Sequence, residues 1–106
     1  MNASESSGPV TVIIRARLRG SVASAQALHD QVTGATREMA QAAGDISHRT
    51  FLNPADPMEF LGIDEWQSAA AVQAFSSNPQ IVEFFGGLFE GQPEVTVWAS
   101  SGWNEW

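Results

Sequence analysis

The chain has 106 residues, which is the size of one domain with a single hydrophobic core. Five arginines, no lysine and twelve acidic residues give a net charge of −7, which argues against partners that need a basic surface, such as nucleic acid or an anionic membrane. The absence of cysteine excludes a disulfide framework, a thiolate metal site and a thiol nucleophile.

The apolar segments are also too short for a membrane protein. None approaches the ~18 residues that a membrane span needs, and segment 1–9 is polar and lacks the apolar run of a signal peptide. We therefore expect a cytoplasmic protein with a flexible tail over residues 1–9 and a single domain over residues 10–106.

The first half of the domain predicts a strand, a helix and a second strand. Val10–Leu18 alternates and is rich in β-branched residues, as is typical of a strand. From Val22 to about Ala42 the apolar residues recur at helical spacing. Gly44 suits the end of this helix, and Ile46–Asn53 follows as a strand. The predicted buried stripe of the helix is Val22, Ala25, Leu28, Val32, Ala35 and Met39.

The second half begins with a third strand, Met58–Trp66. The prolines of segment 54–57 fix φ and cannot donate to a ladder, so this segment predicts a rather long hairpin connection. Ser68 is a candidate cap for a short helix over Ala69–Phe75, and Asn78-Pro79 predicts the start of a second one. Gly91 and Pro93 are expected to stop that helix before a last strand, Glu94–Ala99.

This β-α-β-β-α-β order predicts an α+β, ferredoxin-like fold with an antiparallel sheet and helices on one face. Such a sheet should be polar on its bare face. Here that face carries Ile13, Leu61, Ile63 and Trp98. We therefore expect a homodimer in which a second copy packs sheet against sheet. The two tryptophans of the tail, Trp103 and Trp106, either cross onto that partner or lie in solvent.

Four segments carry a resemblance to a known family. They are Gly44-Asp45-Ile46-Ser47-His48, the 53–57 turn, Asp64-Glu65-Trp66-Gln67-Ser68, and Asn78-Pro79 ahead of an aromatic helix. Over about residues 10–99 the chain resembles the antibiotic biosynthesis monooxygenase domain family. The resemblance implies a dimeric α+β barrel. It specifies activity less well, because the superfamily includes cofactor-independent monooxygenases, haem-degrading enzymes and isomerases.

The resemblance also shows departures at the positions that carry the family's chemistry. Trp66 matches the tryptophan of the quinone-forming oxygenases. Gly62, however, stands where they have asparagine, Val72 near their tyrosine and Phe85 near their arginine, and Phe75 replaces a histidine of many members. Haem-degrading members need a histidine in the second helix and an asparagine on the first strand. This chain has neither, so we expect no cofactor.

Three residues are the candidate catalytic set. Trp66 could stack on a flat aromatic substrate and donate its indole N–H. The unperturbed pKa of a histidine, about 6.5, suits His48 to act as a general base that removes a phenol proton. Asp64 could orient His48 if both residues lie on one face of adjacent strands. The alternatives are a core tryptophan, a half-buried histidine bonded to a neighbour, and an aspartate paired with an arginine.

The candidate substrate-binding residues are Trp66, Phe75, Phe85, His29 and Phe60. The phenylalanines could equally seat the helices on the sheet, and His29 could lie on the helix surface. His29, His48 and Asp64 have the ligand types of a two-histidine, one-carboxylate iron site, but nothing in their spacing requires one, and we expect no metal.

These observations predict an enzyme that oxidises an aromatic polyketide-like phenol or quinol with molecular oxygen. One alternative is a non-oxidative cyclase or isomerase with the same base and acid. The other is a small-molecule-binding module without turnover, which the departures at Gly62, Val72 and Phe85 favour.

Overall fold

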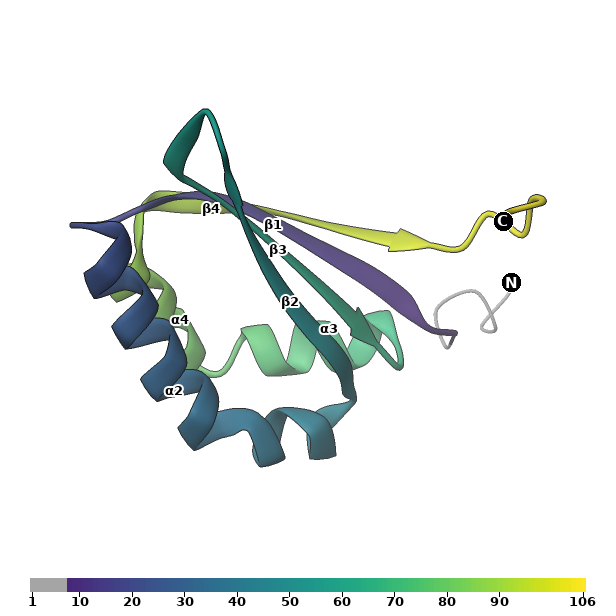
Figure 1. Cartoon of the computed structure of the whole chain (residues 1–106). Helices are drawn as coiled ribbons and strands as arrows, with labels where there is room; N and C mark the ends of the chain where they lie inside the picture. The colour runs from purple at the N-terminus through teal and green to yellow at the C-terminus, as the bar shows by residue number, and fades with distance from the viewer. Residues whose placement is uncertain (1–7) are drawn as a thin grey trace.

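The computed structural model describes residues 8–106. Its four strands form one antiparallel sheet in the order β2-β3-β1-β4, and the helices all cover the same face (Figure 1). The predicted ferredoxin-like fold is confirmed. Apart from Gly8 and Pro9, the predicted tail lies outside the described residues. The elements are β1 (Val10–Leu18), α2 (Val22–Ala43), β2 (Asp45–Asn53), β3 (Asp56–Trp66), α3 (Ala69–Ser76), α4 (Pro79–Leu88) and β4 (Phe89–Ala99).

The helix starts follow from local capping. The Ser68 side chain accepts a hydrogen bond from the Ala71 backbone N–H (3.1 Å), and Asn78 accepts one from the Gln80 N–H (2.9 Å) with proline following at the first helical position. These caps confirm the predicted breaks that separate β3, α3 and α4. No helix in the described part of the chain is long and apolar enough to cross a membrane.

Two predicted connections are wrong in detail. The long hairpin loop is a tight turn, because β2 runs to Asn53 and β3 begins at Asp56, with the Asn53 side chain accepting a hydrogen bond from the Ala55 N–H. The last strand begins at Phe89 rather than Glu94, since buried Phe89 pairs with Leu18. Gly91, with φ of 70°, then lies in an irregularity of the strand and not at the end of a helix.

The predicted stripe of α2 holds only in its first half. Ala25 is buried and Val32 half-buried, whereas Ala35 and Met39 are exposed. The inward row continues at four-residue spacing through Thr36 and Ala40, which line a cavity. Because this half of α2 faces open space instead of a packed core, its inner side need not be apolar.

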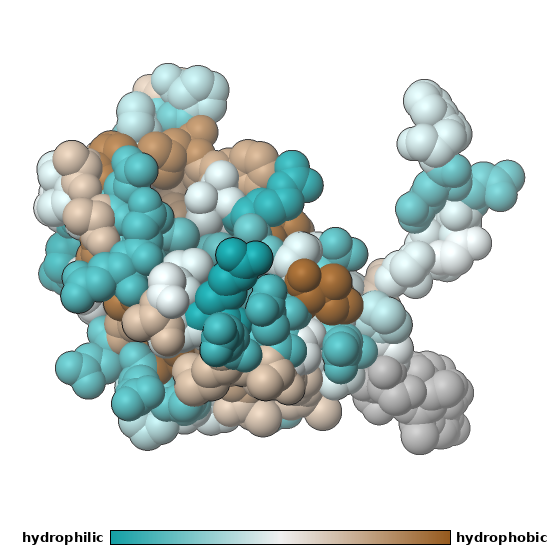
Figure 2. All heavy atoms as spheres, turned by 60° about the horizontal axis from the view of Figure 1, so that its bottom comes forward, coloured by the Kyte–Doolittle hydropathy of each residue, from teal (hydrophilic) through white to brown (hydrophobic). Residues whose placement is uncertain are grey.

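The core is divided into two clusters at opposite ends of the sheet. Val10, Val12, Trp66 and Val72 form one, beneath α3. Leu18, Ala25, Leu88 and Phe89 form the other, beneath the start of α2 and the end of α4. The space between sheet and helices is therefore packed at both ends and open in the middle. Viewed from the helical side, the surface is a mosaic of hydrophilic and hydrophobic residues (Figure 2).

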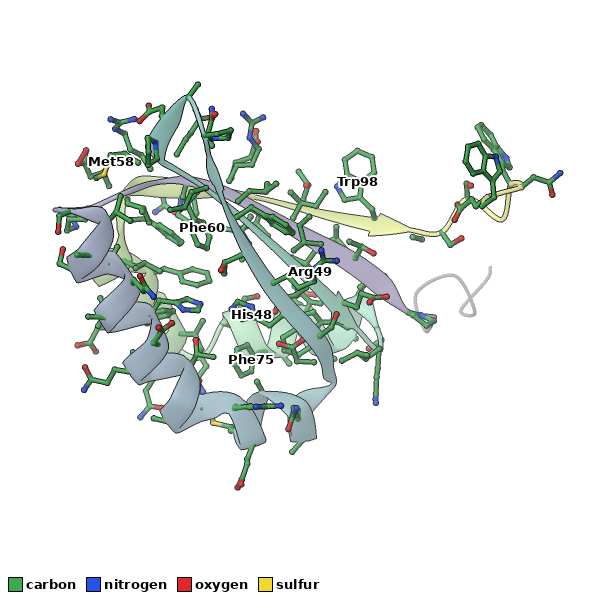
Figure 3. The ribbon with its side chains drawn as sticks, in the orientation of Figure 1. His48, Arg49, Met58, Phe60, Phe75 and Trp98 are labelled. Carbon is green, nitrogen blue, oxygen red and sulfur yellow. The ribbon has the colours of Figure 1, made fainter. Side chains whose placement is uncertain are left out.

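The opposite face of the sheet carries apolar side chains that no helix covers. Ile13 pairs with Ile63 in the centre of the sheet, and Leu61 pairs with Phe51 towards its edge. Trp98 is 57% exposed and projects from β4 on the side away from the helices (Figure 3). Charged side chains share this face, since Arg15 pairs with Leu61 and Arg49 with Ile63, and Arg15 forms an ion pair with Glu59. It is a mixed surface with an apolar centre at Ile13 and Ile63, and not the polar surface expected of a sheet face in water.

Gly44 sets the junction at which α2 turns into β2. Its φ is 123°, and a Cβ there would lie 3.2 Å from the Ala71 Cβ. We expect Gly44→Ala to lower the free energy of unfolding by about 1–3 kcal/mol, the usual cost of such backbone strain. Gly34→Ala is the matched control: it lies inside α2 with nothing within 4 Å, so it should add about 0.5–1 kcal/mol. Urea unfolding measures both, and equal stability of the two variants would contradict this account of Gly44.

Candidate active site

A cavity of about 460 Å³ opens between the sheet and the helices. That volume lies within the range of small-molecule pockets, roughly 300–1,000 Å³. Its apolar wall comes from every layer of the fold and includes Val12, Ile14, Trp66, Phe75, Phe84 and Phe85. Its ionisable groups are His48 and Asp45 from β2, Asp64 from β3 and Arg37 from α2. The cavity is thus largely apolar, with its acids and histidine gathered on the sheet side.

Strand pairing brings the predicted catalytic residues together. His48 and Asp64 are partners across β2 and β3, and the His48 Nδ1 lies 2.7 Å from the Asp64 Oδ1. Trp66 follows two residues after Asp64 on the same face, is 4% exposed and packs against Phe75 with ring centroids 5.1 Å apart. Figure 3 shows His48 and Phe75 directed into the space between sheet and helices.

The predicted substrate-binding residues divide between two hollows. Trp66, Phe75 and Phe85 line the main cavity, whereas His29 and Phe60 line a smaller one of about 170 Å³ beneath the start of α2. The Phe60 ring covers Gly62, since a Cβ on Gly62 would lie 3.2 Å from it. Phe60 therefore occupies the space next to Gly62, the position at which the quinone-forming relatives have asparagine.

The two histidines connect these hollows. The Nε2 atoms of His29 and His48 are 2.9 Å apart, and the ring planes are inclined by only 18°. The His29 Nδ1 lies 3.0 Å from the Asp30 Oδ1. Asp30, His29, His48 and Asp64 thus form one hydrogen-bonded row from the outside of α2 to the cavity. No group of three or more metal-ligating side chains converges within residues 8–106.

Asp45 is a candidate residue that the sequence analysis missed. It pairs with Trp66, and an irregularity between Asp45 and Ser47 turns its side chain into the cavity. Burial, followed by the neighbouring Asp64 carboxylate, raises the pKa of Asp45 to about 7. This carboxyl therefore exchanges its proton near neutral pH, as acid–base chemistry requires.

The site also makes stability depend on pH. The hydrogen bond to Asp64 raises the pKa of His48, against the opposing effect of burial. A group whose pKa is raised by folding stabilises the folded state below its ordinary pKa and loses that contribution as pH rises through the raised value. Both Asp45 and His48 are of this kind. The contribution of Asp45 to stability is therefore lost as the pH rises from about 4 to about 7. The contribution of His48 is lost as the pH rises above about 6.5.

Comparison with known proteins places the chain in a family. The model of the family described as antibiotic biosynthesis monooxygenase matches residues 9–86. The chain belongs to this family. No curated protein matches its sequence.

Several solved structures share the fold at low sequence identity. SnoaB, a cofactor-independent oxygenase from Streptomyces nogalater, has in a mutant form 14% identity and a TM-score of 0.70, with 88% of this chain and 93% of that chain covered. A putative antibiotic biosynthesis monooxygenase from Bordetella bronchiseptica has 17% identity and a TM-score of 0.71, covering 88% and 97%. Rv0793 from Mycobacterium tuberculosis has 20% identity and a TM-score of 0.64, covering 92% and 100%. At such identities the likeness establishes the fold, and the activity of this chain has to be argued from its own residues.

Proposed function

We propose that this protein is a cofactor-independent monooxygenase that oxidises an aromatic polyketide-like phenol or quinol. One observation carries the proposal: a largely apolar cavity of about 460 Å³ has its acids and a histidine gathered beside a buried tryptophan. A flat aromatic ring suits the apolar walls, and the polar groups on the sheet side suit its hydroxyl group. Membership of the monooxygenase family and the shared fold with the SnoaB oxygenase support the same reading.

The chemistry needs little from the protein beyond a base and a dry cage. Removal of a proton leaves an electron-rich anion, and its electrons reduce molecular oxygen. When a ring CH₂ becomes a carbonyl, one oxygen atom enters the product and the other leaves as water, so the substrate is the only reductant. The Asp45–Asp64–His48 cluster would take the first proton, while Trp66 and Phe75 hold the ring and keep water away.

Where the quinone-forming relatives have polar side chains on the helices, this chain has apolar ones, and its polar side chains lie on the sheet side of the cavity instead. Val72 and Phe85 stand near positions where those relatives have tyrosine and arginine, and Phe75 stands where many family members have histidine. All three line this cavity and are apolar. The ionisable groups lie instead on β2 and β3. We infer that the helical wall binds the ring and the sheet wall carries the acid–base chemistry.

The functional unit is proposed to be a homodimer. The uncovered face of the sheet is centred on Ile13 and Ile63, with Trp98 and Phe51 exposed beside them. A second copy of the same face would bury these side chains and leave both cavities accessible from the helical side. The tail beyond β4 extends away from the body (Figure 1) and carries Trp103 at 82% exposure, in reach of such a partner.

A non-oxidative cyclase or isomerase is the second candidate, favoured by one observation. The pKa of Asp45, raised to about 7, suits proton transfer that needs no oxygen. The test is to incubate the protein with anthrones, naphthols and quinols in air and under nitrogen, and to analyse the products. Conversion only in air supports the oxygenase, and equal conversion in both atmospheres supports the cyclase or isomerase. Binding without conversion would contradict both proposals.

A further inference from the structure

His48 is the base expected from the sequence, yet protein atoms occupy both of its ring nitrogens. Its Nδ1 lies 2.7 Å from the Asp64 Oδ1, and its Nε2 lies 2.9 Å from the His29 Nε2. A general base must be within hydrogen-bond reach of the proton that it takes. In this arrangement His48 offers no free nitrogen to a ligand in the cavity.

The histidine pair links two carboxylates. The His29 Nδ1 faces a carboxylate oxygen of Asp30, and the His48 Nδ1 faces one of Asp64. The two Nε2 atoms lie 2.9 Å apart, and the Thr33 hydroxyl lies 3.3 Å from the His29 Nε2. The pair therefore connects Asp64 to α2, and its role is to hold that carboxylate in position.

Asp45 has the free acceptor that His48 lacks. Its Oδ1 is buried and has no hydrogen-bond partner among the residues that the structure describes. The side chain lines the cavity next to its strand partner Trp66 and near Asp64. A buried acceptor without a partner costs stability. A hydrogen-bond donor in the cavity, such as the hydroxyl of a phenol, would meet the Asp45 carboxyl on the side that lines the cavity.

The charges around Asp45 come from three elements. Asp64 lies on β3, His48 on β2 with His29 and Asp30 of α2 behind it, and Arg37 of α2 lines the same cavity. From α3 and α4 the wall receives apolar side chains and Ser76. The histidine pair therefore holds the Asp64 carboxylate in place near Asp45.

We propose that Asp45, and not His48, is the catalytic base of this site, and that His29 is a positioning residue. This inference rests on the proposed function. The ligand's O–H or ring C–H bond breaks, its electron pair stays on the ligand, and the proton forms an O–H bond on the Asp45 carboxylate. Asp64, held by the histidine pair, accepts a hydrogen bond from the new carboxyl group. Asp45 therefore selects ligands with an acidic hydroxyl or methylene group next to an aromatic ring.

The test begins on the full chain without ligand. Protein labelled with ¹³C in aspartate carboxyls and ¹⁵N in histidine rings is titrated by NMR from about pH 4 to about pH 9. We expect one carboxyl to titrate near 7, to vanish in Asp45→Asn and to persist in the remote control Asp56→Asn. His29→Gln should move the His48 titration. Carboxyls that all titrate below about pH 5, or a His48 with a free, solvent-exchanging nitrogen, would overturn the inference.

A turnover assay tests the assignment of Asp45 separately. With any naphthol or anthrone that the wild type converts, Asp45→Asn should lower kcat at least about 100-fold, the usual contribution of a general base, and Asp56→Asn should leave it unchanged. Full activity of Asp45→Asn would contradict the assignment. If no probe is converted, the proposed oxygenase function fails, while the ligand-free titration still decides the protonation of Asp45 and of the histidine pair.

Discussion

Replacement of Trp66 by alanine is expected to lower the free energy of unfolding by about 3–5 kcal/mol, the usual cost of truncating a large buried aromatic side chain. Trp66 is 4% exposed and packs against Val10, Val12 and Val72 in one of the two core clusters. Its loss would enlarge the cavity into the core. The variant should therefore lose both stability and affinity for aromatic ligands, whereas Trp66→Phe, which keeps a ring against Phe75, should lose less of each.

Urea unfolding at one fixed protein concentration measures this effect, since dimer formation would make stability depend on concentration. Val82→Ala is the control: Val82 is 57% exposed on α4, away from the proposed dimer face, so its truncation should change the free energy by less than about 0.5 kcal/mol. If Trp66→Ala unfolds at the same urea concentration as Val82→Ala, Trp66 does not anchor the core in the manner described.

A charge placed in the centre of the uncovered sheet face should separate the proposed dimer into monomers. Ile13 pairs with Ile63 there, and Ile13→Asp would bury an unpaired carboxylate between the two copies. Burying an unpaired charge costs several kcal/mol, so the dimer should dissociate at least about 100 times more readily. The monomer should still fold, because the change leaves both core clusters intact.

Light scattering of the separated protein gives the mass directly. We expect twice the chain mass of 11.4 kDa for the wild type and the single value for Ile13→Asp. Val82→Asp is the matched control, since Val82 is 57% exposed on α4, away from that face. It should remain dimeric. A wild type that is monomeric at micromolar concentration would contradict the sheet-to-sheet interface.

Much of the fold could be predicted from local signals. Alternation in β1, helical spacing in α2, and the Ser68 and Asn78-Pro79 caps each predict an element that the structure contains. The errors arose where packing overrides local sequence. Phe89 joins β4 because it is buried beside Leu18, so the strand begins before the glycine and proline that were expected to precede it. Only the assembled core supplies that information.

The candidate site was predictable only in part, for reasons of register. His48 and Asp64 share a face of adjacent antiparallel strands, so alternation brings them together. Asp45 precedes the predicted strand, and strict alternation from His48 would point it outward. The irregularity between Asp45 and Ser47 reverses that direction. The feature that could have indicated Asp45 is its place directly after Gly44, at the start of the strand that pairs with Trp66.

The contact between His29 and His48 could not be predicted from either residue's own element. It depends on how α2 crosses the sheet, and periodicity places His29 only on the edge of the helix's apolar stripe. The structure brings the two Nε2 atoms to 2.9 Å and so joins α2 to the catalytic wall. Phe60 shows the converse case, because it shares a strand face with Asp64 and Trp66 but lines the smaller hollow.

The most direct test of the central claim is oxygen uptake by the purified, metal-free protein in the presence of anthrones, which carry a ring CH₂ group. We predict uptake of one oxygen molecule for each ring CH₂ that becomes a carbonyl, by wild type and Asp56→Asn, and loss of uptake in Asp45→Asn. Uptake that requires an added metal or reductant, or no uptake with any of these compounds, would contradict cofactor-independent oxidation in this cavity.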